Sequence, residues 1–186
     1  RPVRKDEIEL AERGLYVESW LPERRSRRKP ILFVHGELGG SWVWERFLHH
    51  VAGRGWEGHA LNLRNHFWSQ TADPATLDIE SYTEDVVAAV ERLGPNTVAV
   101  GHGMGGANAL CYAAEHPDVV TALVVIEVAP EVLRSGIETV RRVITSGDEF
   151  ASLDDVVDTF RRYYPYATTE QLERRARATV VPTEDG

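Results

Sequence analysis

The sequence predicts an α/β fold: a mainly parallel sheet with an antiparallel hairpin before it and helices after it. Apolar runs alternate strictly with amphipathic helical patterns from residue 30 to residue 128, which indicates βαβ units with right-handed crossovers. Two short alternating runs precede this region, and no further buried strand follows it. With 186 residues, of which 42% are hydrophobic, the chain can bury the core of one ordinary domain.

The strands are predicted from runs without helical spacing. Residues 7–12 and 15–21 alternate loosely around a glycine, which is typical of a hairpin. "PILFVHG" and "GHALNL" are continuously apolar, as expected inside a parallel sheet. The predicted strands after the hairpin are residues 30–36, 58–63, 97–101 and 121–128.

Helices are predicted between these strands, over residues 41–55, 78–94 and 105–116. Their apolar residues recur at helical spacing, which is typical of helices that cover a sheet. The first stripe comprises Trp44, Phe47, Leu48 and Val51, and the second comprises Ile79, Tyr82, Val86, Val87 and Val90.

The last part of the chain predicts helices alone. Ser152 and Thr168 are expected N-caps, each followed three residues later by a polar partner. Helices on the carboxyl side of a sheet are typical of a lid over a pocket. We therefore divide the chain into a core, residues 1–131, and a helical lid or cap, residues 132–186.

Composition excludes several classes of partner. The net charge of −8 disfavours nucleic acid, and the basic run 24–29 is interpreted as a solvated loop. No apolar run reaches membrane-spanning length, and no signal peptide opens the chain. Cys111 is the single cysteine, which fits a reducing cytoplasm. No cofactor and no metal are expected.

The stretch "GHGMGG" contains the most informative turn. It joins a predicted strand to a predicted helix, and such a turn aims one side chain at bound ligand. A packing turn is one alternative. A dinucleotide loop is another, since Gly101, Gly103 and Gly106 match G-x-G-x-x-G. That fingerprint belongs after the first strand, however, and here it follows the third buried one.

A second motif, His35-Gly36 at the end of the first buried strand, accompanies this turn. Together they make the chain resemble the α/β-hydrolase family, and in particular its small esterase and lipase-like members. The matching segments lie in family order and spacing between about residues 30 and 131. They are "VHGELGGSWVW", "LNLRNHFWS", "SYTEDVVAAVERL", "VGHGMGGANALCYAAEHPDVV" and "LVVIEVAPE". The resemblance implies a nucleophile elbow, an oxyanion hole and a lid.

The resemblance also implies roles for individual residues. Gly103 stands at the nucleophile position, and the backbone N–H groups of Met104 and Glu37 would form the oxyanion hole. Glu127 ends the strand after the elbow helix, where some members place their acid. His35 is expected to be structural, and His102 to face into the fold.

Three departures from the family pattern put the usual chemistry in doubt. Gly103 has no side chain, so acyl transfer by the usual route is impossible. The family's catalytic histidine comes late, but all seven histidines lie at or before His116. The family pattern continues beyond residue 186 with two more strands that carry the usual acid and this histidine, so we expect a fragment of a longer chain. Asn65 and Phe67 also replace two expected glycines, whereas Ser69 keeps its usual, structural place.

Aromatic residues in the loop and lid segments predict a small hydrophobic, ester-like ligand. The alternative is that most of these residues only pack the core or the lid. The candidate substrate-binding residues are Gly36, Leu38, Trp42, Phe67, Trp68 and Tyr163.

Three functions remain open. The first is an ester, thioester or lactone hydrolase scaffold that is inactivated by Gly103. The second is a lyase, cyclase or cofactor-free oxygenase that uses His102, Glu37 or Glu127 as its general base. The third is a protein that binds a ligand without catalysis. An open apolar sheet edge also predicts a complementing C-terminal fragment or a homodimer.

Overall fold

The structure is a computed structural model that describes residues 3–24, 27–129, 138, 141 and 149–183. The chain divides into two compact units, residues 1–130 and 131–186. The predicted boundary between residues 131 and 132 lies outside the described residues.

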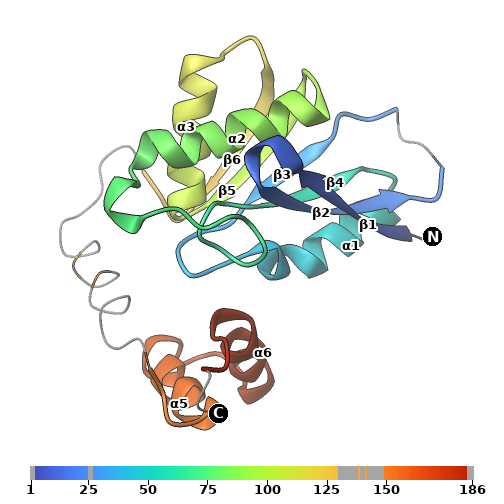
Figure 1. Cartoon of the computed structure of the whole chain (residues 1–186). Helices are drawn as coiled ribbons and strands as arrows, with labels where there is room; N and C mark the ends of the chain where they lie inside the picture. The colour runs from blue at the N-terminus through green and yellow to red at the C-terminus, as the bar shows by residue number, and fades with distance from the viewer. Residues whose placement is uncertain (1–2, 25–26, 130–137, 139–140, 142–148, 184–186) are drawn as a thin grey trace. The chain divides into compact units, whose positions relative to one another are not determined.

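The first unit contains a six-stranded sheet in the order β1-β2-β4-β3-β5-β6 (Figure 1). β1 and β2 pair antiparallel, as do β2 and β4, whereas β3 is parallel to β4 and β5, and β5 to β6. The mainly parallel sheet with an antiparallel hairpin is therefore confirmed. The bounds are β1 Val3–Leu10, β2 Leu15–Pro22, β3 Ile31–Val34, β4 Gly58–Asn62, β5 Thr97–His102 and β6 Val120–Ile126.

Helices cover both faces of this sheet (Figure 1). Leu32 and Val34 of β3 pack with α2, whereas Phe33 between them packs with α1, because successive strand side chains point to opposite faces. Strands buried on both faces explain the continuous apolar runs. The helices are α1 Glu45–Gly53, α2 Ile79–Leu93 and α3 Met104–Glu115, with 3₁₀ turns at Ala11–Arg13, Ser41–Trp44 and Pro74–Thr76.

Some predicted details are wrong. β1 begins at Val3, four residues before the prediction, and ends at Leu10. It is an edge strand with mostly exposed, charged residues, so hydrophobic alternation could not locate it. Phe47 and Ile79 were placed in buried stripes but are 57% and 44% exposed. Ile79 is the first residue of α2, at the end of its stripe.

The second unit contains α5 Leu153–Tyr163 and α6 Thr169–Thr179. Ser152 caps α5 as predicted, and Thr168 forms a capping box with Gln171 at the start of α6. The two helices bury their own small core, made of Val156, Val157, Phe160, Leu172 and Ala176.

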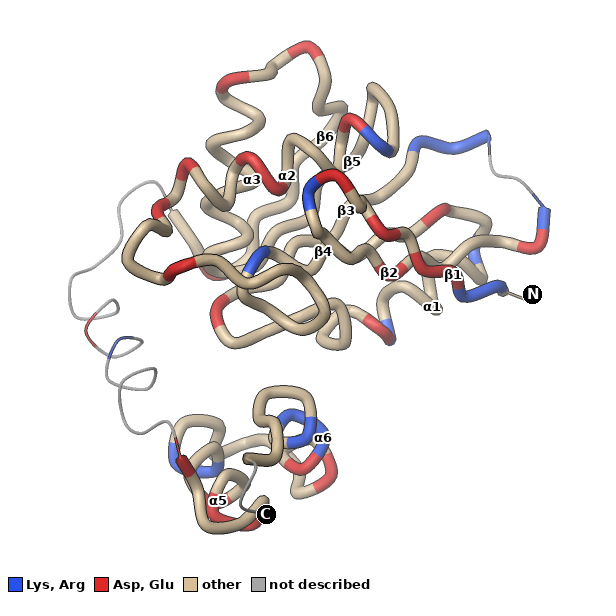
Figure 2. The backbone as a smooth tube through the Cα atoms, viewed as in Figure 1, with Lys and Arg blue, Asp and Glu red and all other residues tan. Residues whose placement is uncertain are grey.

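The surface charges agree with the prediction of a solvated basic loop. Figure 2 shows Lys and Arg on the connection before β3, where residues 27–29 are exposed. Among the described helices, none has the length and apolarity needed to cross a membrane.

Candidate functional site

The elbow lies between β5 and α3, at the carboxyl edge of the sheet. Gly103 has φ 53° and ψ −125°, the left-handed conformation predicted for this position, which favours glycine. Its N–H donates to the Ile126 carbonyl at 2.9 Å, and its carbonyl accepts from the Ala107 N–H at 3.0 Å. The turn is therefore held from both sides, by β6 and by the first turn of α3.

The glycines around Gly103 are required by space. A Cβ on Gly101 would lie 2.5 Å from the Gly105 carbonyl oxygen. A Cβ on Gly105 would lie 2.6 Å from the Val34 carbonyl oxygen and closer still to that of His35. Because these atoms are backbone, they cannot move aside, and α3 can approach β3 only with glycine here.

The predicted oxyanion loop is a tight turn directly after β3. The Gly39 N–H donates to the Gly36 carbonyl at 3.2 Å, and Leu38 has φ 54°. A positive φ at the third residue is typical of a type II turn. A Cβ on Gly103 would lie 3.6 Å from the Gly36 Cα, so the Glu37 nitrogen lies within about 8 Å of the Gly103 Cα. The two predicted oxyanion donors therefore lie near one another at this edge of the sheet.

The Glu37 side chain points toward the elbow. Its Oε2 lies 2.8 Å from the position that a Cβ on Gly103 would take. The space of a serine side chain thus lies directly against a carboxylate oxygen. Such a carboxylate repels negative charge that develops nearby on a carbonyl oxygen.

His35 connects this site to the loop after β4, and it is structural as predicted. Its Nδ1 is 2.8 Å from the Gly36 carbonyl, and its Nε2 accepts from the Leu63 N–H at 3.1 Å. Burial lowers the pKa of His35 to about 3. A proton on Nε2 would also face a donor instead of an acceptor, so the neutral ring is the stable form.

His102 does not face into the fold, contrary to what the resemblance implied. Its side chain is 40% exposed, and its Nε2 lies 2.8 Å from Oε2 of Glu127. Its Nδ1 lies 2.6 Å from the place of a Cβ on Gly36, so the ring covers the glycine of the oxyanion loop. Packing against this glycine keeps the ring at the surface, where Glu127 reaches it.

A buried ion pair anchors the loop after β4. Asp85 of α2 accepts from the Arg64 backbone N–H at 2.8 Å, from its Nε at 2.9 Å and from its Nη2 at 2.7 Å. These hydrogen bonds raise the pKa of Arg64. Ser69 is structural as predicted, since its hydroxyl bonds the Tyr16 N–H and the Asn62 carbonyl.

Sequence reasoning did not select His66, which lies beside His35 with ring centroids 4.8 Å apart. Its Nδ1 is 2.9 Å from the Arg64 carbonyl, so the proton of the neutral ring sits on Nδ1. Burial lowers the pKa of His66, while the charge of Glu37 acts in the opposite direction. The sequence signal that could have identified His66 is its position in "LRNHFWS", a segment that matches the family pattern.

The predicted substrate-binding residues are only partly brought together. Gly36 and Leu38 belong to the turn beside Gly103. Phe67 and Trp68 lie on the loop after β4 with ring centroids 5.2 Å apart, and Trp68 is 71% exposed. Trp42 lies in the 3₁₀ turn before α1, and Tyr163 lies in the separate helical unit.

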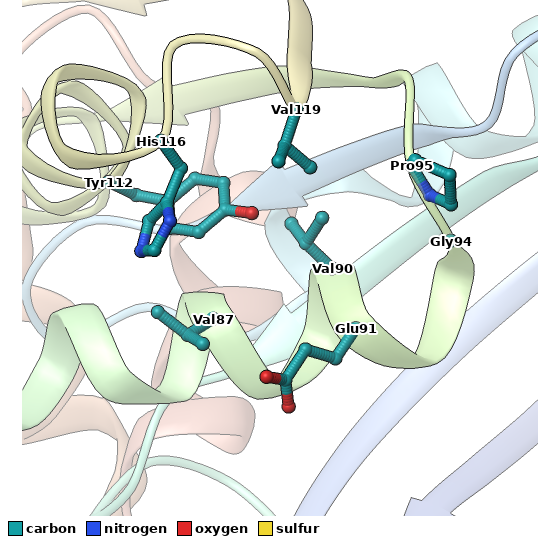
Figure 3. A pocket seen from close by; sticks show the side chains of 8 residues that line it. All are labelled: Val87, Val90, Glu91, Gly94, Pro95, Tyr112, His116 and Val119. Atoms are coloured by element: carbon teal, nitrogen blue, oxygen red, sulfur yellow. The ribbon is translucent and has the colours of Figure 1, made fainter.

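A separate pocket lies at the opposite edge of the sheet, away from the elbow. It has a volume of about 270 Å³ and is lined by the ends of α2 and α3 (Figure 3). Val87, Val90 and Val119 form its apolar wall, and His116 and Tyr112 lie side by side at one end. In the part of the chain that the structure describes, no group of His, Cys, Asp or Glu side chains is arranged to hold a metal ion.

Comparison with known proteins agrees with this geometry. The family model described as "alpha/beta hydrolase fold" matches residues 29–184. The chain is 23% identical over 158 residues to 2-(acetamidomethylene)succinate hydrolase of Mesorhizobium japonicum, covering 84% of this chain and 56% of the relative. It is 33% identical over 115 residues to lipase LipV of Mycobacterium tuberculosis, covering 62% and 42%. An α/β hydrolase structure from Novosphingobium aromaticivorans superposes with a TM-score of 0.83 at 24% identity, covering 99% of this chain and 66% of that one.

The chain belongs to the α/β-hydrolase family. It spans about half the length of the curated relatives that it matches.

Proposed function

We propose that the chain carries a site for small hydrophobic esters, thioesters or lactones, and that this site forms no acyl-enzyme. The observation that carries the proposal is Gly103, which has elbow geometry but offers no oxygen to attack a carbonyl. The Met104 and Glu37 N–H groups would bind the carbonyl oxygen, since the first N–H groups of a helix have no partner within it.

The relatives support a hydrolase scaffold, since they are named as a succinate-derivative hydrolase, a pyrethroid hydrolase and a lipase. Phe67 and Trp68 support a hydrophobic ligand, because they are exposed on a loop at the same edge of the sheet as the elbow. In the proposal, α5 and α6 serve as the lid, with Tyr163 and Trp42 contributing to ligand binding. Glu127 is the proposed acid, held against His102.

A fluorophosphonate probe tests the absence of an acyl-enzyme. The unaltered protein is expected to show no adduct by intact mass, whereas Gly103→Ser in the full-length protein should be labelled. Aryl-ester turnover should then rise by roughly 10³ or more, because a nucleophile and its base act as a unit. An adduct on the unaltered protein, or labelling of the serine variant no faster than free serine, would contradict the proposal.

A second candidate function is catalysis without a covalent step, by a lyase, cyclase or cofactor-free oxygenase. The Glu37 carboxylate beside Gly103 favours it, since this group is a base already in contact with the place of the missing nucleophile. A site that binds ligand without turnover is the remaining alternative.

We also propose that another strand pairs with β6, from a complementing C-terminal fragment or a second copy. β6 lies at the end of the strand order, and Val124 on it is 46% exposed, which would favour aggregation if left open. Sedimentation of the purified protein tests this: a monomer that unfolds cooperatively would count against it. A cytoplasmic location and the absence of a nucleic-acid partner remain part of the proposal.

A further inference from the structure

We infer that Glu37 is a general base that activates water for direct attack on the substrate carbonyl, in the place of the missing nucleophile. The inference rests on the proposed function, since it concerns the same site and the same class of carbonyl substrate. It assigns the Glu37 side chain a catalytic role that is separate from the oxyanion role of its backbone N–H.

The position of the Glu37 carboxylate supports this role. Oε2 of Glu37 lies 2.8 Å from the place of a Cβ on Gly103, and Cδ lies 3.8 Å from it. In an elbow, that side-chain direction points at the reacting carbonyl. A water molecule held there in place of a serine hydroxyl is therefore within hydrogen-bond reach of the carboxylate.

The charge of the Glu37 carboxylate also supports this role. A charged carboxylate would repel the oxyanion formed by attack from a serine, because both charges would be present together. When the carboxylate itself takes the proton, it becomes neutral as negative charge appears on the carbonyl oxygen. The net charge of the site then stays constant, so in this role the carboxylate adds no second negative charge beside the oxyanion.

The ionisable groups that neighbour Glu37 already have other partners. His102 bonds Glu127 through Nε2, and its Nδ1 faces Gly36. His66 donates Nδ1–H to the Arg64 carbonyl, and burial lowers its pKa, so it is neutral. Glu37 is thus the carboxylate that adjoins the elbow.

The reaction balances without a further reactant. Glu37 removes a proton from water while the water oxygen bonds to the carbonyl carbon, and the carbonyl electron pair moves to oxygen. The carbonyl then re-forms as the bond to the alcohol oxygen breaks. The departing alkoxide takes the proton from Glu37, which restores the carboxylate and leaves an acid and an alcohol.

Turnover of p-nitrophenyl butyrate by the full-length protein tests the inference. Glu37→Gln is expected to lower kcat/KM about 10²- to 10⁴-fold, the range of general-base catalysis. The matched control is Glu115→Gln, since Glu115 is exposed at the end of α3, and kcat/KM should stay within twofold. Circular dichroism and the melting temperature show that each variant is folded.

Chemical rescue provides the second test. Glu37→Ala removes the carboxylate, and added formate is expected to restore its rate at least tenfold without affecting the Glu115→Ala protein. A single turnover in H₂¹⁸O should place the label in the product acid. A mass increase on the peptide containing Glu37 would instead mean that Glu37 attacks the carbonyl itself, and would overturn the inference.

The outcomes separate the inference from the proposed function. If esters turn over and Glu37→Gln leaves the rate within threefold, the inference fails and the ester site stands. If a non-hydrolysable aryl ketone quenches tryptophan fluorescence but no ester turns over, the inference also fails while binding stands. If neither binding nor turnover occurs, both fail.

Discussion

The elbow and the loop after β4 lie at the same edge of the sheet, and both contain residues with a positive φ. The family pattern has glycines in both segments, but for different reasons. Gly103 has φ 53°, and Asn65 and Phe67 have φ 61° and 51°. At the elbow, backbone carbonyls fill the space beside the neighbouring glycines. In the other loop, Asn65 stabilises its own conformation through hydrogen bonds with the Ala72 backbone at 2.8 and 2.5 Å.

The difference separates two kinds of glycine in one family pattern. Where glycine supplies only a positive φ, asparagine can adopt the same conformation at modest cost, and local hydrogen bonds offset it. Where glycine supplies space between two backbones, no side chain can replace it. The substitution at Asn65 is therefore compatible with an intact fold, whereas Phe67 retains the cost of its positive φ.

The largest expected effect tests the space requirement at the elbow. Gly105→Ala should lower the free energy of unfolding by more than about 3 kcal/mol, above the usual cost of overpacking, because the new Cβ meets the Val34 and His35 carbonyls. Urea denaturation measures the loss. Gly53→Ala is the matched control: a Cβ there meets nothing within 4 Å, so stability should be equal or slightly higher. Equal losses in both variants would remove the distinction.

The second prediction concerns what anchors the loop after β4. Asp85→Ala should lower the free energy of unfolding by about 3 kcal/mol, because it removes the closest partner of the partly buried Arg64 and leaves only the exposed Glu84. Glu84→Ala is the control, since Glu84 is exposed and its oxygen lies 3.4 Å from the same guanidinium. Urea denaturation of both variants measures their free energies of unfolding, which are then compared. A loss below 1 kcal/mol for Asp85→Ala would show that the loop is held by its own hydrogen bonds.

A pH titration of stability tests His35, which joins the two loops. Burial lowers its pKa from 6.5 to about 3 and that of His59 to about 4. The unfolded chain therefore binds more protons, and stability should fall as pH drops below about 6.5. Each histidine contributes up to about 1.4 kcal/mol per pH unit. His35→Gln should remove one such contribution, and a flat profile in the unaltered protein between pH 7 and 5 would contradict this.

The smallest expected effect tests the conformational cost in the loop after β4. Phe67→Gly should change stability by less than about 1 kcal/mol, because relief of the positive φ offsets the lost ring contacts with Tyr16 and Trp68. Phe67→Ala keeps the unfavourable φ without the ring, so it should be about 1 kcal/mol less stable than Phe67→Gly. Equal melting temperatures for the two variants would mean that the left-handed conformation costs nothing here.

The sequence by itself determined the sheet class, the helices and the positions of the glycine-rich turns after β3 and β5. Apolar runs report burial on both faces, and closely spaced glycines report a turn that only they permit. It placed the start of the charged edge strand β1 four residues too late, because the residues of this strand carry no clear apolar pattern. Only the tertiary structure decided how the polar side chains pair: Glu37 against the elbow, His102 with Glu127, and Arg64 with Asp85. These contacts join residues about 20 to 66 positions apart, and their side-chain directions depend on how strands β3 to β6 and helix α2 pack, which local sequence patterns do not encode.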